Sequence, residues 1–301
     1  MFPGLKEQGY HITFYTGTIG EAVTKFDPHI DRCVMQTDDA VPNEQLGRFW
    51  RALEKKYDKF VNLCETVERT FLAMKGNINF IWPHHMRHKY LNANYLEFVH
   101  DMAGVPLPPR IKFYPAPEEA QWAREEHARV GSKVALWVLS GSAIHKVWPY
   151  LDIVIERVLR KTDARFVLIG DEQCKKLEEG WEDNPRVYCR SGKWSVRETL
   201  AFAQVADLVI GPETGVLNAV SMEPMPKIVM LSHSSVENLT RDWVNTVSLY
   251  SSTECYPCHR LHMVVDGFKD CVESKSIPGI AACQADLLPG VVEDSILKVL
   301  E

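Results

Sequence analysis

Two short loops carry the residues whose types and spacing best suit chemistry, and each follows an apolar run. The first loop, residues 139–149, combines small side chains with the positive charge of Lys146. The second, residues 211–215, reads Gly-Pro-Glu-Thr-Gly and contains Glu213 and Thr214. Small residues let the backbone approach a ligand closely, and a helix that begins after such a loop directs free N–H groups towards it. Together the two loops predict a site for an anion such as a diphosphate.

Each loop also has a plainer interpretation. The first is equally compatible with an ordinary strand-to-helix connection that carries a solvated lysine. The second is equally compatible with a helix start that is capped by Thr214. The diphosphate interpretation requires both loops to lie at one edge of the same sheet, so it depends on the order of the elements along the chain.

In the second half of the chain, that order is typical of a parallel sheet covered by helices. Strand-like apolar runs occupy residues 134–139, 166–169, 187–189, 207–210 and 227–231. Helical patterns alternate with them at residues 149–161, 195–203, 215–222 and 289–300. This alternation predicts a doubly wound α/β domain, in which ligands bind outside the carboxyl ends of the strands.

The first half repeats the pattern less regularly. Strand-like runs at residues 11–16, 31–36 and 59–64 alternate with helical patterns at residues 18–26 and 42–57. An irregular stretch at residues 65–94 precedes a helix expected at residues 95–103, which Gly104 should end. The prolines that follow indicate a stiff linker. We therefore predict two domains, residues 1–112 and 113–301.

Composition and charge exclude several classes of protein. The 301 residues are 46% hydrophobic and 25% charged, which is ordinary for a folded soluble protein. A net charge of -6 argues against a general affinity for nucleic acid or for an anionic membrane. No apolar run approaches the roughly 20 residues that a membrane span needs, and the N-terminus has no secretion signal. We expect a cytoplasmic globular protein.

Four of the eight cysteines gather near the C-terminus, at Cys255, Cys258, Cys271 and Cys283. A Cys-x-x-Cys pair with two further thiols is compatible with a tetrahedral structural zinc ion. The separations do not repeat the paired knuckles of most zinc modules, because the last two cysteines stand alone. Two disulfides or four unliganded thiols therefore remain alternatives, although the expected cytosolic setting disfavours disulfides.

The motifs around the two loops resemble one protein family. Lys146-Val-Trp-Pro149 is similar to the Lys-x-Trp-Pro segment of the family 9 glycosyltransferases, the ADP-heptose:lipopolysaccharide heptosyltransferases. Residues 194–201 and 206–220 resemble that family's segment that ends in Asp-Thr-Gly-x-x-His. Residues 231–235 stand where the family has an aromatic-Gly-Pro-Thr loop. In the first half, residues 4–17 and 27–32 give a more diffuse similarity.

This resemblance implies a GT-B architecture, with two Rossmann-like doubly wound domains facing a cleft. The second domain would bind a nucleotide-diphosphate sugar, ADP-linked and heptose-like, and the first a glycan or phosphorylated glycolipid of the lipopolysaccharide type. Transfer would proceed with inversion and without a metal or other cofactor. Lys146 and the amides around Thr214 and Gly215 would stabilise the departing diphosphate. Any membrane contact would be peripheral, through the acceptor.

A set of polar residues is expected around that donor. Asp171 and Glu198 are the carboxylates available for ribose hydroxyls, and Ser234 would reach the sugar or a phosphate, although helix capping is an alternative for this serine loop. A basic run at residues 84–89 would suit an anionic acceptor, unless it is a solvated loop. The complete predicted donor set is Ser140, Gly141, Ser142, Lys146, Asp171, Glu198, Glu213, Thr214, Gly215, Asn218 and Ser234.

Three departures from the family pattern keep other functions open. Glu213 replaces the family's aspartate, and Asn218 replaces its histidine. The strand and Gly-Asp loop that open the family's sequences, and supply its catalytic carboxylate, have no counterpart after Met1, so the base is unknown and slow turnover is expected. The alternatives are a catalytically silent nucleotide-sugar-binding or scaffold protein of the same fold, or another GT-B enzyme such as a nucleotide-sugar epimerase.

Overall fold

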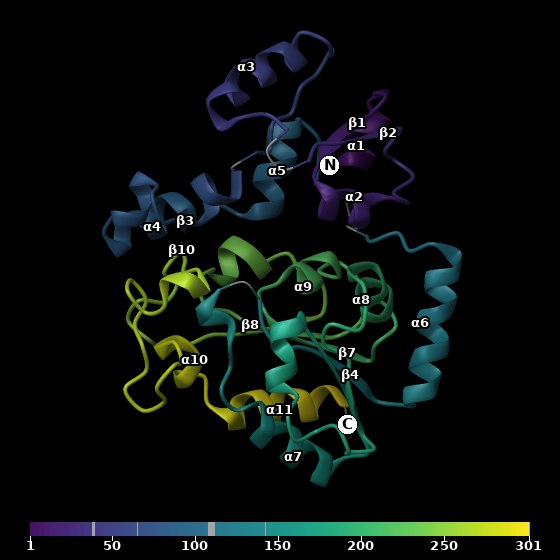
Figure 1. Ribbon diagram of the computed structural model, residues 1–301, viewed down its shortest axis with the longest axis vertical. Coiled ribbons are helices and arrows are strands. Elements are labelled where there is room, and N and C mark those ends of the chain that lie inside the picture. The colour runs from purple at the N-terminus through teal and green to yellow at the C-terminus, as the bar shows by residue number, and fades with distance from the viewer. Residues whose placement is uncertain (38–39, 65, 108–111, 142, 301) are drawn as a thin grey trace.

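The protein is described by a computed structural model that covers residues 1–37, 40–64, 66–107, 112–141 and 143–300. A smaller N-terminal group of elements lies over one end of a larger C-terminal α/β domain (Figure 1). The predicted division into residues 1–112 and 113–301 stays a prediction, and its boundary directly follows a stretch outside the described residues.

A six-stranded parallel sheet forms the centre of the C-terminal domain, with strand order β6-β5-β4-β7-β8-β9. The strands are β4 (Val134–Val138), β5 (Arg165–Ile169), β6 (Val187–Cys189), β7 (Leu208–Pro212), β8 (Lys227–Met230) and β9 (Thr246–Leu249). The direction of winding reverses between β4 and β7, and the loops after these two strands are the ones that carry Lys146 and Glu213. This confirms the predicted doubly wound sheet and places both loops at its switch point.

Helices cover both faces of this sheet, which is why its strands read as continuous apolar runs. Side chains alternate along β4, so that Ala135 and Trp137 pack beneath α7 (Leu151–Lys161) and α11 (Pro289–Leu300), whereas Leu136 and Val138 pack beneath α6 (Pro117–Val130) and α8 (Val196–Ala203). The helices of this domain are α6 (Pro117–Val130), α7 (Leu151–Lys161), α8 (Val196–Ala203), α9 (Gly215–Ala219), α10 (Ala282–Asp286) and α11 (Pro289–Leu300). Short helical turns η3 (Ile144–Lys146), η4 (Glu172–Leu177), η5 (Val236–Thr240) and η6 (Val264–Asp266) lie in its loops.

The N-terminal part has a much smaller sheet, in which β1 and β2 pair in parallel. Its elements are α1 (Phe2–Glu7), β1 (Thr13–Thr16), α2 (Thr18–Thr24), β2 (Arg32–Met35), α3 (Asn43–Glu54), η1 (Val67–Phe71), β3 (Ala73–Met74), η2 (Ile78–Ile81), α4 (His84–Leu91) and α5 (Tyr95–Ala103). The helix expected at residues 95–103 is confirmed, and Gly104 ends it in the left-handed conformation with φ of 61°.

Two expectations for this part are wrong. Residues 59–64 form no strand, because a strand needs a ladder partner and β1 pairs with β2 alone among the described strands. The stretch at residues 65–94 is not irregular, since it contains β3 and α4. The sequence of α4, HHMRHKYL, lacks an apolar stripe at helical spacing, so its periodicity gave no signal.

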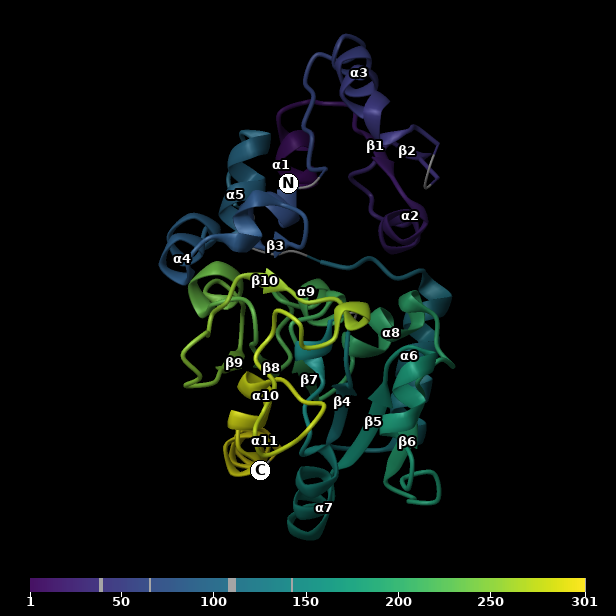
Figure 2. The same cartoon turned by 60° about the vertical axis from the view of Figure 1, so that its left-hand side comes forward.

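Contacts far apart in the sequence join the two parts. β3 pairs in parallel with β10 (Arg260–Leu261), and Figure 2 shows α4 and β3 beside β10. The Asn238 amide donates to the carbonyls of Leu91 and Ala93, at 3.3 and 2.8 Å. The N-terminal elements therefore rest on the carboxyl end of the large sheet. In the described chain, no helix is both long and apolar enough to cross a membrane.

Candidate anion-binding site

The structure brings the two predicted loops together at the carboxyl ends of β4 and β7. A Cβ atom built on Gly141 would lie 2.9 Å from Cδ and 3.7 Å from Nζ of Lys146. It would also lie 3.5 Å from Cγ2 of Thr214. The lysine side chain therefore lies across the glycine and beside the threonine, and any larger residue at position 141 would displace it.

The polar groups at this junction lack protein partners. Among the described residues, the ammonium of Lys146 makes no hydrogen bond or ion pair, although the residue is partly buried. Burial lowers the pKa of Lys146, and the charge of Glu213 opposes that shift. The Thr214 hydroxyl is buried without a hydrogen-bond partner. In the described chain, the buried Thr214 hydroxyl and the partly buried ammonium of Lys146 are therefore both available to a ligand.

The start of α9 adds to this site. Thr214 occupies the N-cap position as the plainer interpretation expected, but its side chain makes no capping hydrogen bond. Gly215 has no heavy atom within 4 Å of a built Cβ, and both Gly215 and Asn218 are exposed. The helix ends at Ala219, three residues before the predicted Met222.

Glu213 points away from this open space and into the protein. It is only 3% exposed, and Oε1 accepts hydrogen bonds from the backbone N–H groups of Ser232 and His233, at 3.0 and 2.8 Å. Oε2 accepts one from the N–H of Ser234, at 3.3 Å. The carboxylate therefore holds the loop after β8 in place.

A trio of possible metal ligands surrounds this carboxylate: one atom each from His145, Glu213 and His233 lies within 4.8 Å of the others. The atoms are already engaged. Nδ1 and Nε2 of His145 contact Oγ of Ser232 at 2.7 Å and N of His262 at 3.4 Å. Burial lowers the pKa of both histidines and the positive charge of Lys146 adds to this, which also repels a metal cation. We interpret the trio as a hydrogen-bonded cluster.

The other predicted donor contacts are less closely gathered. Asp171 caps η4 by accepting from the N–H groups of Gln173 and Cys174. Glu198 forms a capping box with Ser195 at the start of α8. Their contact with a ribose stays a prediction. The hydroxyl of Ser140 donates to the carbonyl of Gly141 at 3.3 Å, the hydroxyl of Ser234 contacts His233 at 2.8 Å, and Ser142 lies outside the described residues.

The four C-terminal thiols do come near one another. Burial raises the pKa of Cys258 to about 12 and that of Cys271 to about 11, and the charge of Cys255 adds to both shifts. Burial also raises the pKa of Cys283, which all three other thiols raise further. In a tetrahedral zinc site, the sulfurs lie about 3.8 Å apart. No three of these sulfurs lie within 4.8 Å of one another. The thiols are therefore suitable zinc ligands by type, but their sulfurs lie farther apart than those of a formed zinc site.

In the basic run at residues 84–89, some side chains contact the C-terminal domain and others are exposed to solvent. Arg87 is buried and its Nε donates to the carbonyl of Cys258 at 2.8 Å, while Nε2 of His84 lies 3.0 Å from the carbonyl of Pro257. His85 and Lys89 are exposed. Part of the run therefore holds α4 on the C-terminal domain, and only the exposed part is available to an acceptor.

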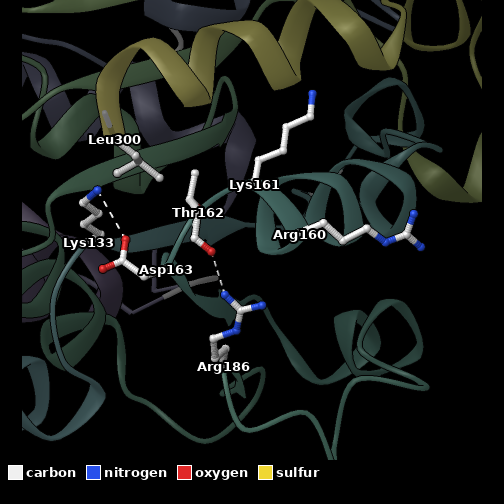
Figure 3. A pocket seen from close by; sticks show the side chains of 7 residues that line it. All are labelled: Lys133, Arg160, Lys161, Thr162, Asp163, Arg186 and Leu300. Carbon is white, nitrogen blue, oxygen red and sulfur yellow. Dashed lines mark hydrogen bonds and ion pairs between the residues drawn. The ribbon is translucent and has the colours of Figure 1, made fainter.

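A separate surface hollow of about 600 Å³ lies at the opposite, amino edge of the sheet (Figure 3). Its charged groups are paired: Lys133 lies 3.3 Å from Asp163, and Arg186 donates to the carbonyl of Thr162 at 2.8 Å. In a doubly wound sheet, ligands bind at the carboxyl edge. This hollow is therefore not the candidate site.

A doubly wound sheet with a second α/β part above its carboxyl end is the architecture of the glycosyltransferase-B class. No family model and no curated protein matches the sequence. Solved structures do match, and they confirm the predicted GT-B fold and the resemblance to family 9.

Three of these structures cover nearly the whole chain. A glycosyl transferase of family 9 from Veillonella parvula is 14% identical with a TM-score of 0.61, over 96% of this chain and 88% of that chain. The ADP-heptose lps heptosyltransferase II of E. coli is 11% identical with a TM-score of 0.63, over 99% and 92%. The E. coli heptosyltransferase WaaC with ADP is 11% identical with a TM-score of 0.53, over 99% and 94%. At these identities the similarity shows the fold.

Proposed function

We propose that this protein is a glycosyltransferase that binds a nucleotide-diphosphate sugar at the junction of Gly141, Lys146 and Thr214. The observation that carries the proposal is that, among the described residues, the ammonium of Lys146 and the buried hydroxyl of Thr214 have no partner, and both side chains lie next to Gly141. A diphosphate supplies the negative charge and the acceptor oxygens that both groups lack. A resemblance to structures that include a heptosyltransferase with ADP supports an ADP-linked donor with a heptose-like sugar.

The proposed reaction is an inverting transfer. A base removes the proton of an acceptor hydroxyl, whose oxygen then bonds to the anomeric carbon as the bond from that carbon to the diphosphate breaks. The bonding electron pair leaves with the diphosphate, so negative charge grows next to Lys146. A fixed cation there stabilises the transition state more than the ground state. The acceptor would be a glycan or phosphorylated glycolipid, reached in the cytoplasm, and the exposed side chains of His85 and Lys89 suit its phosphates.

A second candidate is a nucleotide-sugar-binding protein of the same fold that transfers nothing. The observation that favours it is the engagement of Glu213, whose carboxylate is fully occupied by the loop after β8 and is not free to act as a base. An epimerase acting on a nucleotide sugar is a third possibility, and it would need no acceptor.

Titration calorimetry with ADP and UDP, followed by measurement of nucleotide release from an ADP-sugar, tests the proposal. A glycosyltransferase binds ADP and releases it faster when an acceptor glycan is present. Binding without release identifies the silent protein, and a change in the sugar without an acceptor identifies the epimerase. Failure to bind either nucleotide contradicts all three functions.

We also propose that the four C-terminal thiols hold a structural zinc ion, which would draw their sulfurs together and displace their protons. The purified chain should then contain about one zinc, and chelation should lower the Tm by about 5 °C or more. The double variant C258S/C283S should lose the metal, whereas C33S, at an exposed cysteine, should keep it. A metal-free wild type with eight titratable thiols would contradict the zinc site.

A further inference from the structure

The carboxylate of Glu213 is the centre of a buried network that connects three loops of the switch point. Besides the two backbone N–H groups of the loop after β8, Oε1 accepts the hydroxyl of Ser232 at 2.5 Å. That hydroxyl has a single proton, so the contact between Ser232 Oγ and His145 Nδ1, at 2.7 Å, requires Nδ1 of the histidine to be the donor. A chain of two hydrogen bonds therefore runs from His145 through Ser232 to Glu213.

The far side of the same imidazole is fixed as well. With its proton on Nδ1, His145 presents a lone pair at Nε2, and the N–H of His262 donates to it at 3.4 Å. The N–H of Ile144 in turn donates to the carbonyl of His262 at 3.1 Å. η3 is thus held from both sides, and Lys146 is its last residue. The position of the lysine across Gly141 depends on this arrangement.

We propose that Glu213 is a positioning residue that holds η3 through Ser232 and His145, and that its buried carboxylate is the counter-ion that keeps Lys146 charged while the site is empty. The inference rests on the proposed diphosphate site. Under this proposal Glu213 does not contact the ligand itself, because its oxygens accept hydrogen bonds from the loop after β8.

Burial makes this counter-ion necessary. Beside Lys146, η3 contributes His145 and the loop after β8 contributes His233, and both are buried. These imidazoles are neutral, because burial lowers the pKa of each. Burial also lowers the pKa of Lys146, and the negative charge of Glu213 opposes that shift. Without it, burial would favour the neutral amine of Lys146, which attracts a diphosphate weakly.

The test compares the pH dependence of ADP binding in wild type, E213Q, E213D and S232A, measured by titration calorimetry between pH 6 and pH 10. Binding falls as pH rises through the pKa of Lys146. E213Q removes the negative charge, so its midpoint should move down by about one pH unit. S232A breaks the hydrogen-bond chain but keeps the charge, so it should lose about tenfold in affinity at every pH without a shift. E179Q, at an exposed carboxylate, is the matched control and should change neither quantity.

A second readout needs no nucleotide: the rate at which acetic anhydride labels Lys146, followed by mass spectrometry against pH, reports the same midpoint. E213Q should shift it downwards, and E213D, which keeps the charge, should not. If E213Q does not fold, a shifted midpoint in E213D or S232A overturns the inference. An equal loss of affinity at all pH values in E213Q, with an unchanged labelling midpoint, also overturns it. Wild type that labels as expected yet binds no ADP overturns the proposed function instead.

Discussion

Replacing Lys146 with alanine should lower the rate of sugar transfer about 100-fold to 1,000-fold. Its ammonium lies at the junction of the two loops without a partner in the described part of the chain, and the proposed reaction places a growing negative charge beside it. Loss of one preorganised group that faces such a charge has effects of this size. The affinity for ADP should fall less, by about tenfold to 100-fold, because the charge on the ground-state diphosphate is more dispersed.

Steady-state kinetics with an ADP-sugar, together with calorimetry, measure both effects. The matched control is K298A, which removes an exposed lysine of α11 and should leave rate and affinity unchanged. The Tm of K146A should not fall, since burial disfavours this charge in the empty site. If K146A bound ADP and transferred sugar as wild type does, the site would have to lie elsewhere.

The second prediction concerns Arg197, whose replacement by methionine should lower the free energy of unfolding by about 3 kcal/mol. The guanidinium is buried in α8 and forms two hydrogen bonds of 2.7 Å with the carboxylate of Glu119 in α6. It also donates to the carbonyls of Ala22 and Tyr114, at 2.6 and 3.0 Å. One side chain thus connects α2 of the N-terminal part with two helices of the C-terminal domain.

Urea denaturation at pH 7 measures this loss, and R160M serves as the control. Arg160 is exposed and, within the described residues, its ion pair is with Glu156 on its own helix, so its loss should cost about 0.5 kcal/mol or less. Arg197 holds the pKa of Glu119 below its ordinary value of 4.5. The stability from this pair is therefore present above that value and is lost as pH falls through the lower pKa of the folded state. The difference between wild type and R197M should shrink below about pH 4.5, and a difference that is independent of pH would contradict the ion-pair explanation.

The sequence was sufficient for the C-terminal sheet because its strands are buried on both faces. A strand such as β7 must then be apolar along its whole length, and that run is visible without any knowledge of the partner strands. Strands and helices in alternation also imply the sheet topology, so the meeting of Lys146 with Thr214 followed from their positions after β4 and β7. Glycines 141 and 211 mark the same edge, where a Cβ on Gly211 would lie 2.7 Å from the carbonyl oxygen of Val138.

The N-terminal part could not be predicted to the same extent. Residues 59–64 have the composition of a strand, but composition cannot supply a ladder partner. β3 and β10 each have two residues and lie 187 positions apart at their first residues, 73 and 260, so neither has a local signal. The buried residues of α4 are Leu91 and Arg87, and arginine is a residue type that a periodicity argument assigns to the solvent-facing side of a helix.

Local periodicity and strand order suffice to predict the doubly wound domain, the two loops at its switch point and the residue types that suit a diphosphate. How those residues are used depends on the folded protein. The fold turns Glu213 inwards onto the loop after β8, places Asp171 and Glu198 in helix caps and brings three distant thiols close enough to Cys283 to raise its pKa. The physical reason is that hydrogen bonds and Coulomb interactions act over a few ångströms in space, whichever residues the fold brings there.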